Sequence, residues 1–327
     1  MDNLSAVLQR FDGLRVLVVG DLMVDEHIWG SASRVSPEAP VLVVDASEDP
    51  EIRPGGAANV ANNLVALGAH AAIIGVVGDD MYGRELCREL LASGVDTGGI
   101  LVDSDRVTSR KTRIWVSHRQ QVVRVDRENR EQLSDSLADG ILDQLKSHLD
   151  DCDAVIFSDY NKGVLVPSIA SRAVDLARSA GRICAVNPKP MNVRGFKGAS
   201  MITVNHSEAE AVVGRALPCE DAVIDAGRSM LAELEAGCII ITRGSVGLSV
   251  FEQDAAATIP AVPTEVYDVA GAGDTVISAI TLALAAGVAP VRAARVGNLA
   301  GGAAVRKLGV AAVTRGEILA IAGAQDE

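Results

Sequence analysis

The stretch Asp268-Val-Ala-Gly-Ala-Gly-Asp-Thr275 decides the interpretation of this chain, because it combines two glycines and two carboxylates within eight residues. It follows a strand-like run, 257–262, and leads directly into an apolar, helix-like segment, 276–286. A glycine-rich turn at the start of a helix leaves backbone N–H groups without partners, beside the positive end of the helix dipole. The stretch therefore predicts an anion site, most often one for phosphate.

The carboxylate of Asp274 would be repelled by an anion at this turn unless it has a task there. The task that fits is to accept the proton of a hydroxyl group as that hydroxyl attacks a phosphoryl group. The alternative is a plain glycine-rich helix start, with Asp274 as a first-turn carboxylate. The second carboxylate and the long helix that follows favour the catalytic interpretation.

The same stretch resembles the C-terminal signature D-T-x-G-A-G-D of the ribokinase-like (PfkB-type) carbohydrate kinases, with Val269 in place of the usual Thr. The resemblance extends over nearly the whole chain. It implies that Asp274 is the catalytic base and that the amides of Gly271, Ala272 and Gly273 form the anion hole. It also implies an α/β fold: a doubly wound, mostly parallel sheet with helices on both faces, plus a small β-sheet lid.

Composition agrees with one large α/β domain, which we place at residues 1–327. Hydrophobic residues make up 48% of the chain but aromatic ones only 3%, so the core must be aliphatic, as in a parallel sheet buried on both faces. The net charge of −13 argues against non-specific binding to nucleic acid or to an anionic membrane surface. A local basic pocket could still hold an anionic substrate.

The five cysteines are scattered, odd in number and without a C-x-x-C pair, which predicts buried thiols in a reducing cytoplasm. The first ten residues lack a basic start followed by an apolar run, and no stretch is long and apolar enough to span a membrane. We therefore expect a cytoplasmic protein without a signal peptide.

Carboxylates follow the first strand-like run, Arg15-Val-Leu-Val-Val-Gly20. Asp21 and Asp25 come after it, at the end of the strand where open α/β sheets bind ligands. They could accept hydrogen bonds from sugar hydroxyls, or lie in a solvated turn. The family has an acidic element here that binds sugar hydroxyls, and Asp25 fits it best.

The run Pro54-Gly-Gly-Ala-Ala-Asn-Val-Ala-Asn63 resembles the family's N-terminal signature, G-G-x-x-x-N. Gly55 and Gly56 allow the backbone to approach a ligand closely. Asn59 can offer both a donor and acceptors to sugar hydroxyls. The alternative is a tight helix start with Asn59 on a solvated face.

Two segments, about 31–45 and 108–126, interrupt the alternation of strands and helices. The first contains the polar run Ser33-Arg-Val-Ser-Pro-Glu-Ala-Pro-Val41 and then a short strand, and the second alternates like a hairpin. We interpret them together as a β lid, and the resemblance implies that it doubles as a homodimer interface. The run S-R-x-S-P-E-A-P-V is similar to one in bacterial heptose 7-phosphate kinases.

Two lysines follow later strands. In Ser158-Asp-Tyr-Asn-Lys-Gly163, the resemblance places Asp159 and Lys162 at the substrate pocket, where a lysine can hold phosphate; the alternative is a plain loop lysine. Asn187-Pro-Lys189 stands where the family has Asp-Pro-Lys. The resemblance implies that Lys189 reaches nucleotide phosphate and that Asn187 weakens the hold on the water shell of the metal.

Asn205 and Glu208 resemble the family's N-x-x-E motif. Magnesium takes oxygen ligands and keeps several waters, so the resemblance implies that both residues hold Mg²⁺ largely through water, with Asn205 also at the nucleotide. The alternative is a helix capping box with Glu208 at the third helical position. ATP, Mg²⁺ and a monovalent cation such as K⁺ are the cofactors that the resemblance implies.

The nucleotide site is extended by two further patterns. Thr242, Gly244 and Gly247 match the family's T-x-G-x-x-G, which lines the nucleotide phosphates. The small-residue helix expected at 295–306 contains Asn298, which the resemblance places at the wall of the adenine site. Close packing between helices would explain its alanines and glycines equally well.

These features predict an ATP-dependent sugar kinase. The resemblance favours D-glycero-D-manno-heptose 7-phosphate as acceptor, phosphorylated at the anomeric hydroxyl to the 1,7-bisphosphate, on the route to ADP-heptose and the inner core of lipopolysaccharide. Arg34, Arg113 and Lys162 are candidates to hold the phosphate of the acceptor. The alternatives are another ribokinase-like sugar, nucleoside or sugar-phosphate kinase, and a non-catalytic sugar- or nucleotide-binding regulator.

Other chemistries lack their motifs. The chain has no G-x-x-x-x-G-K-[ST] loop, no metal-ligand spacing among its five histidines, and no H-x-G-H motif of a nucleotidyltransferase. Since the sequence stops at Glu327, soon after the kinase signatures, we expect no second activity.

Overall fold

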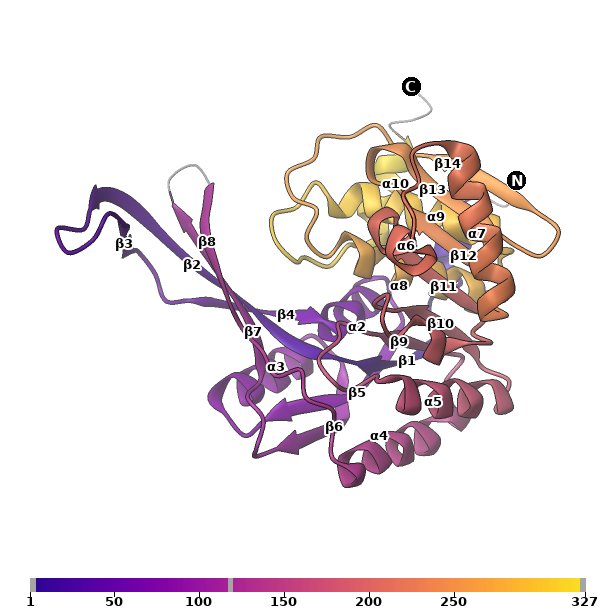
Figure 1. Cartoon of the computed structure of the whole chain (residues 1–327), viewed down its shortest axis with the longest axis horizontal. Helices are drawn as coiled ribbons and strands as arrows, with labels where there is room; N and C mark the ends of the chain where they lie inside the picture. The colour runs from indigo at the N-terminus through magenta and orange to yellow at the C-terminus, as the bar shows by residue number, and fades with distance from the viewer. Residues whose placement is uncertain (1–3, 117–119, 324–327) are drawn as a thin grey trace.

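The structure, a computed structural model, describes residues 4–116 and 120–323; residues 117–119 of the expected lid hairpin, with His118, lie outside the described residues. Its centre is a sheet in which nine strands are described, in the order β14-β13-β12-β11-β10-β9-β1-β5-β6 (Figure 1). The strands from β12 to β6 are parallel, and β13 and β14 add an antiparallel edge. The predicted mostly parallel sheet is confirmed.

The strands of the large sheet have the following bounds: β1 (Arg15–Gly20), β5 (His70–Gly78), β6 (Asp96–Asp103), β9 (Ala154–Ser158), β10 (Ile183–Asn187), β11 (Met201–Asn205), β12 (Ile239–Thr242), β13 (Gly247–Phe251) and β14 (Ala256–Pro260). The chain moves outward from β1 to β5 and β6 on one side, and from β9 to β12 on the other. The order therefore reverses between β1 and β9, the point at which open α/β sheets bind ligands.

Helices cover both faces of this sheet, as expected. One face carries α1 (Leu4–Gln9), α2 (Ala57–Ala66), α3 (Met81–Ala92), α8 (Ala272–Ala285), α9 (Pro290–Ala304) and α10 (Arg315–Gly323). The other carries α4 (Asp135–His148), α5 (Pro167–Ser179), α6 (His206–Val213) and α7 (Glu220–Leu234). In β1, Val16 and Val18 pack on the first face and Leu17 and Val19 on the second, so the apolar middle of this strand is buried on both sides.

A second, smaller sheet forms an arm that projects from this body (Figure 1). It contains β2 (Leu22–Val35), β3 (Leu42–Ala46), β4 (Glu51–Gly56), β7 (Ser109–Val116) and β8 (Gln120–Arg127). Its order is β3-β2-β7-β8, with β4 also paired to β2.

This small sheet extends beyond the predicted segments 31–45 and 108–126, because β2 begins at Leu22 and β4 belongs to it. The first half of β2 was not predicted as a strand, because it contains the polar residues Asp25, Glu26 and His27. All three are buried in the structure. Arginines of β7 contact the two carboxylates, with Arg113 at Asp25 and Arg110 at Glu26. Paired charges thus allow a strand that does not look apolar to run through the interior.

The cysteines are all unpaired in the structure. Cys152, Cys184 and Cys238 are buried as expected, and burial raises the pKa of the Cys152 thiol to about 11. Cys219 is exposed, which differs from the expectation, because it precedes α7 at the surface. In the described part of the chain, no helix has the length and apolar character that crossing a membrane requires.

Candidate active site

Asp274 lies in the first turn of α8, close to the point where the strand order reverses, and is buried. The hydroxyl of Tyr160 donates to its Oδ1 at 2.5 Å, and Nδ2 of Asn59 donates to its Oδ2 at 2.8 Å. Burial raises the pKa of Asp274, while these two hydrogen bonds act in the opposite direction by stabilising the carboxylate. Both oxygens are therefore oriented, as a proton acceptor requires.

The turn before α8 needs glycine at one position and leaves space at another. Gly271 has φ of 75°, and a Cβ there would lie 2.8 Å from Nδ2 of Asn59. A Cβ at Gly273 would meet nothing within 4 Å. The N–H of Ala272 donates to the carbonyl of Val269 at 3.3 Å, whereas those of Gly271 and Gly273 find no acceptor among the described residues. The turn thus has free donors, but not at all three predicted positions.

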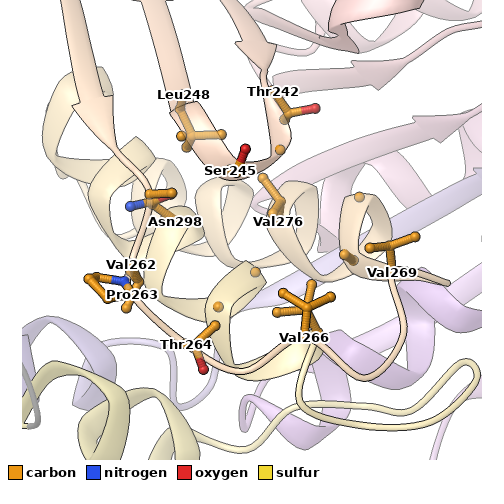
Figure 2. A pocket seen from close by; sticks show the side chains of 18 residues that line it. Thr242, Ser245, Leu248, Val262, Pro263, Thr264, Val266, Val269, Val276 and Asn298 are labelled. Atoms are coloured by element: carbon orange, nitrogen blue, oxygen red, sulfur yellow. The ribbon is translucent and has the colours of Figure 1, made fainter.

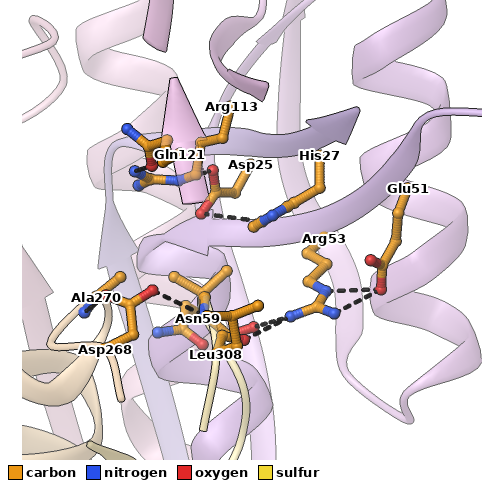
Figure 3. A network of polar contacts seen from close by, with 12 residues as sticks. Asp25, His27, Glu51, Arg53, Asn59, Arg113, Gln121, Asp268, Ala270 and Leu308 are labelled. Atoms are coloured by element: carbon orange, nitrogen blue, oxygen red, sulfur yellow. Dashed lines mark hydrogen bonds and ion pairs between the residues drawn. The ribbon is translucent and has the colours of Figure 1, made fainter. Parts of the chain in front are cut away.

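Asp268, the first carboxylate of the stretch, has a structural role. Its Oδ1 accepts from the N–H of Ala270 at 3.0 Å and its Oδ2 from that of Gly309 at 2.9 Å. Arg53 donates to the carbonyl of Leu308 at 3.0 Å beside it (Figure 3). The loop after α9 is thereby tied to both the turn and β4.

Asp25 lies in the buried half of β2, facing the lid strand β7 (Figure 3). Its Oδ1 accepts from Nε of Arg113 at 2.7 Å, and its Oδ2 is 3.7 Å from Nε2 of His27. Burial alone would raise the pKa of Asp25, but His27 and Arg113 outweigh it and lower that pKa. Asp25 is therefore an ionised acceptor in an interior position.

The G-G-x-x-x-N run crosses from β4 into α2. Gly56 has φ of 58°, and a Cβ there would lie 2.8 Å from the carbonyl oxygen of Asp21, so this junction needs glycine. At Gly55 a Cβ would lie 3.1 Å from the side chain of Met23. Asn59 is 2% exposed, which rules out the solvated-face alternative, and its amide contacts the predicted base.

The loop after β9 is held by two buried carboxylates. Asp21 accepts from the backbone N–H groups of Tyr160, Lys162 and Val164. Burial, aided by the charge of Asp159, raises the pKa of Asp21 to about 6. Asp159 in turn accepts from the backbone N–H groups of Asn161 and Lys189 and from the Asn192 amide. Both carboxylates position the loop that presents Tyr160 and Lys162.

Among the residues predicted to bind the nucleotide and its metal, Lys189 and Glu208 form an ion pair of 2.6 Å. The other Glu208 oxygen accepts from the N–H of Asn205 at 2.9 Å, and Oδ1 of Asn205 accepts from the N–H of Glu208 at 2.8 Å. The capping box considered from the sequence is therefore present. It does not exclude a role at the metal, because the same side chains line a cavity.

That cavity has a volume of about 160 Å³ and joins the predicted base to the predicted metal residues; its polar lining includes Tyr160, Asn187, Lys189, Asn205, Glu208, Thr242 and Asp274. Oxygen donors of this kind fit Mg²⁺. Because the oxygens of Glu208 and Asn205 already accept protein hydrogen bonds, they fit an ion held through its water shell.

A local hydrogen bond explains why Asn187 stands where the family has Asp. Its Nδ2 donates to the carbonyl of Thr203 at 3.0 Å, across from β10 to β11. An aspartate could not donate this hydrogen bond and would place two acceptors together. The substitution joins the two strands and leaves an amide oxygen as the polar atom for the cavity.

A larger cavity of about 640 Å³ lies on the other side of the Gly273 turn, and its lining is mostly apolar (Figure 2). Thr242, Gly244 and Gly247 line it, and so does Asn298 of α9, which donates to the carbonyl of Pro260 at 2.8 Å. Gly273 lines both this cavity and the smaller one. A ligand in the large cavity could therefore extend past the turn to Asp274.

The three cations predicted to hold a substrate phosphate are not brought together equally. Arg34 pairs with Asp45 at 3.2 Å on the projecting arm, where β2 meets β3. Arg113 contacts Asp25, and Lys162 contacts Glu128 at 2.6 Å.

Sequence reasoning missed two residues near the base, Tyr160 and Lys111. The Lys111 ammonium lies 5.5 Å from the centre of the Tyr160 ring. Tyr160 could have been found, because it stands between Asp159 and Lys162. Lys111 could not have been found, because no sequence pattern distinguishes it from the other polar residues of an alternating strand.

Comparison with known proteins gives the family. The family model described as pfkB family carbohydrate kinase matches residues 15–315. The bifunctional protein HldE of Geotalea uraniireducens is 42% identical over 98% of this chain, and that of Helicobacter hepaticus is 39% identical over 93%. The chain spans 65% and 63% of the length of these two relatives.

Solved structures agree in fold. Phosphofructokinase-2 from Escherichia coli in complex with potassium has a TM-score of 0.78 at 19% identity, covering 97% of this chain and 100% of that one. Arabidopsis thaliana ribokinase complexed with ribose and ATP has a TM-score of 0.73 at 17% identity, covering 94% and 98%. With this fold, and with the family model matching most of its length, the chain belongs to the pfkB family of carbohydrate kinases, phosphotransferases that act on a hydroxyl group.

Proposed function

We propose that this protein transfers the γ-phosphoryl group of ATP to the anomeric hydroxyl of D-glycero-D-manno-heptose 7-phosphate, giving the 1,7-bisphosphate. The observation that carries the proposal is the position of Asp274. Its carboxylate is oriented by Asn59 and Tyr160, and it lies where a large apolar cavity meets a polar one below the lid. The acceptor is suggested by the likeness of S-R-x-S-P-E-A-P-V and S-D-Y-x-K-G to heptose 7-phosphate kinases.

Different residues would bind the nucleotide, orient the sugar and accept the proton. The adenosine of ATP would occupy the large cavity, with its phosphates passing Thr242, Gly244 and Gly247. Asp25 and Asn59 would orient the sugar. As Asp274 accepts the hydroxyl proton, that oxygen forms its bond to the γ-phosphorus and the bond to the ADP oxygen breaks. The free N–H groups of Gly271 and Gly273, together with Lys189, would stabilise the charge on the moving group.

A metal would be held at Glu208 and Asn205. Bound Mg²⁺ supplies charge neutralisation to the ATP phosphates, and here its water shell would contact the two side chains. A monovalent cation such as K⁺ is included in the proposal, because the similar phosphofructokinase-2 is described in complex with potassium. We place the protein in the cytoplasm, where ATP is present and free cysteines stay reduced.

A coupled assay for ADP, run with a panel of acceptors, tests the activity. The panel contains heptose 7-phosphate, free heptose, fructose 6-phosphate, fructose, ribose and a nucleoside. We expect the highest kcat/KM with heptose 7-phosphate and a requirement for Mg²⁺. A preference for another member would reassign the acceptor within the family, and ATP binding without turnover of any acceptor would favour a regulator.

The lid is proposed to mediate a homodimer. Its exposed apolar residues gather on the arm: Val35, Val41, Leu42, Val123 and Val125. Strand edges and apolar side chains of this kind need cover. Sedimentation at micromolar concentration should show a dimer in the parent and a monomer in Leu42→Asp, with Leu319→Asp on α10 as the control. A monomeric, fully active parent would contradict this prediction.

A further inference from the structure

The small sheet contains a buried histidine, His27 of β2, whose neighbours include both tryptophans of the chain. The centre of the His27 ring lies 6.1 Å from that of Trp29 and 5.9 Å from that of Trp115, with the ring planes nearly parallel. Gly309, in the loop after α9, packs against the edge of the ring, since a Cβ there would lie 2.8 Å from Cε1 of His27. The side chain of His27 is accordingly 0% exposed.

Trp115 determines which nitrogen of His27 bears the hydrogen. Nε1 of Trp115 lies 2.9 Å from Nδ1 of His27. An indole N–H can only donate, so Nδ1 must accept and bears no hydrogen. The single N–H of the neutral ring is therefore at Nε2. The same contact selects the orientation of the ring, because a ring turned over would place a carbon at the indole N–H.

Nε2 of His27 faces Asp25 (Figure 3). It lies 3.7 Å from Oδ2 of Asp25 and has no hydrogen-bond partner within residues 4–116 and 120–323. Asp25 and His27 are two positions apart on one strand, so both side chains belong to the same face of the sheet. An N–H that faces a carboxylate oxygen attracts it, whereas a nitrogen lone pair in that place would repel it. The tautomer imposed by Trp115 is thus the one that attracts Oδ2.

The separation between the two side chains leaves Oδ2 of Asp25 available to a ligand. At 3.7 Å the contact is longer than a hydrogen bond, so it orients the carboxylate without occupying the oxygen. The other oxygen, Oδ1, already accepts from Nε of Arg113 at 2.7 Å. Arg113 and His27 therefore restrain the carboxylate from two sides, and Oδ2 keeps its capacity to accept from a hydroxyl group.

We propose that His27 is a positioning residue for Asp25: its Nε2–H, held in place by Trp115, keeps Oδ2 turned toward a hydroxyl group of the sugar acceptor. The proposal rests on the proposed function insofar as it needs a sugar that binds to Asp25, but it does not depend on which sugar that is. His27 acts through Asp25 and not by touching the sugar, since its ring is fully enclosed. Trp115 acts one step further away, through the tautomer of His27.

His27→Phe and His27→Gln test this role, because they separate packing from hydrogen donation. Phenylalanine keeps a planar ring among the tryptophans but has no N–H, whereas glutamine loses the ring and keeps an N–H near the position of Nε2. We expect His27→Phe to raise the KM for the acceptor about threefold to tenfold, as for the loss of one polar contact. The KM for ATP should stay close to that of the parent. His27→Gln should recover most of the affinity for the acceptor.

The order of these two variants distinguishes positioning from packing. Melting temperatures are measured for both. If the KM for the acceptor follows the melting temperature, with His27→Phe closer to the parent than His27→Gln, the ring only fills space and the proposal is overturned. His148→Phe is the control, because His148 is a half-buried histidine at the end of α4, beside the first residues of β1 and β5. It should leave the KM for the acceptor unchanged.

Trp115→Phe tests the second step, because it keeps a ring and removes the N–H that selects the tautomer. It should raise the KM for the acceptor, but it should add nothing when combined with His27→Phe, since Trp115 acts through His27. Trp29→Phe is the control, because the indole N–H of Trp29 donates to Glu51 at 3.4 Å and not to His27. Additive effects of Trp115→Phe and His27→Phe would overturn the role of Trp115.

Nitrogen NMR of protein that contains isotope-labelled histidine gives a measurement that needs no sugar. The signals of His27, assigned by their loss in His27→Gln, should show a hydrogen on Nε2 and none on Nδ1. A hydrogen on Nδ1 would overturn the proposal even if every kinetic result agreed with it.

The kinetic outcomes also separate this role from the choice of acceptor. If the parent prefers a sugar other than heptose 7-phosphate and His27→Phe raises the KM for that sugar, the heptose assignment fails and the positioning role stands. If the parent prefers heptose 7-phosphate and His27→Phe leaves its KM unchanged, the proposed function stands and the positioning role is overturned.

Discussion

The side of the site proposed to bind the nucleotide and the side proposed to bind the acceptor are built in different ways. The large cavity is lined mostly by small residues and valines, and all of its lining residues come from residues 242–276 and 298–305. The acceptor side consists of charged and amide side chains on β2, α2, β7 and the loop after β9. Within this second group, nearly every charge is matched by a partner.

This difference indicates how each side would recognise its ligand. A cavity made of backbone and small side chains recognises a ligand by shape, and changes there act through space and N–H groups. A network of charged residues recognises a ligand when ion pairs within the protein are replaced by contacts with the ligand. The effect of substituting one of its residues therefore depends on the others. Substitutions should therefore separate the two sides, and those at Asp274, where they meet, should have the largest effect.

Asp274→Asn should lower kcat by about 10²–10⁴-fold while both substrates still bind, because the amide cannot accept the hydroxyl proton. The fold should survive, since asparagine keeps the size of a side chain whose burial already disfavours its charge. Steady-state kinetics and calorimetric binding of ATP measure the two effects. Turnover within a few-fold of the parent would remove Asp274 from the role of base.

Gly273→Val should reduce kcat/KM for ATP by about tenfold to a hundredfold, which is less than the loss of a whole donor from an oxyanion site. The added side chain has room in the fold but enters the space that the two cavities share. The affinity for the acceptor should not change. Gly316→Val is the control, because Gly316 is also the second residue of a helix, and a Cβ there would meet only Oγ1 of Thr314, at 4.0 Å.

If Gly273→Val leaves the kinetics with ATP unaltered, the phosphates do not pass this turn. If it weakens acceptor binding instead, the division between the two sides is wrong at this point. Melting temperatures of both glycine variants would show that neither outcome arises from unfolding.

Tyr160→Phe should change activity least at its optimum, by less than about tenfold, but it should move the pH profile. The tyrosine hydroxyl stabilises the carboxylate of Asp274, so its removal raises the pKa of that group. Because the base must be ionised, the acidic limb of kcat/KM should shift to higher pH. Tyr82→Phe, which removes a hydroxyl that contacts Glu26, is the control. An unshifted limb would separate Tyr160 from the base.

Much of the fold could be predicted from the sequence, because it rests on local patterns. The apolar residues 16–19 indicated a buried strand, and the glycines before 276–286 indicated the start of α8. The first half of β2 could not be predicted, since Asp25, Glu26 and His27 are buried only because other strands supply their partners.

Prediction of the site from the sequence was limited in the same way. Asn59 and Asp274 lie 215 residues apart in sequence, and only motif resemblance placed them together. Arg34 looked equivalent to Lys162 as a candidate cation, yet Arg34 pairs with Asp45 on the arm, whereas Lys162 is buried and pairs with Glu128. Lys111 comes near the ring of Tyr160 only through the pairing of β7 with β2, which no local sequence pattern encodes.

The length of β2 has a mechanical consequence. One strand of 14 residues, with a register irregularity between Ala32 and Arg34, contains Asp25 in its buried half and ends at Val35 on the arm. At about 3.3 Å per residue, the lever from Asp25 to Val35 is about 33 Å long, so a rotation of ~5° at the buried end displaces the far end by ~3 Å. Conversely, any partner that holds the arm also restrains the orientation of Asp25, because the strand between them acts as a long lever. The stiffness of a single strand thus links contacts on the arm to the orientation of Asp25, the proposed ligand of a sugar hydroxyl.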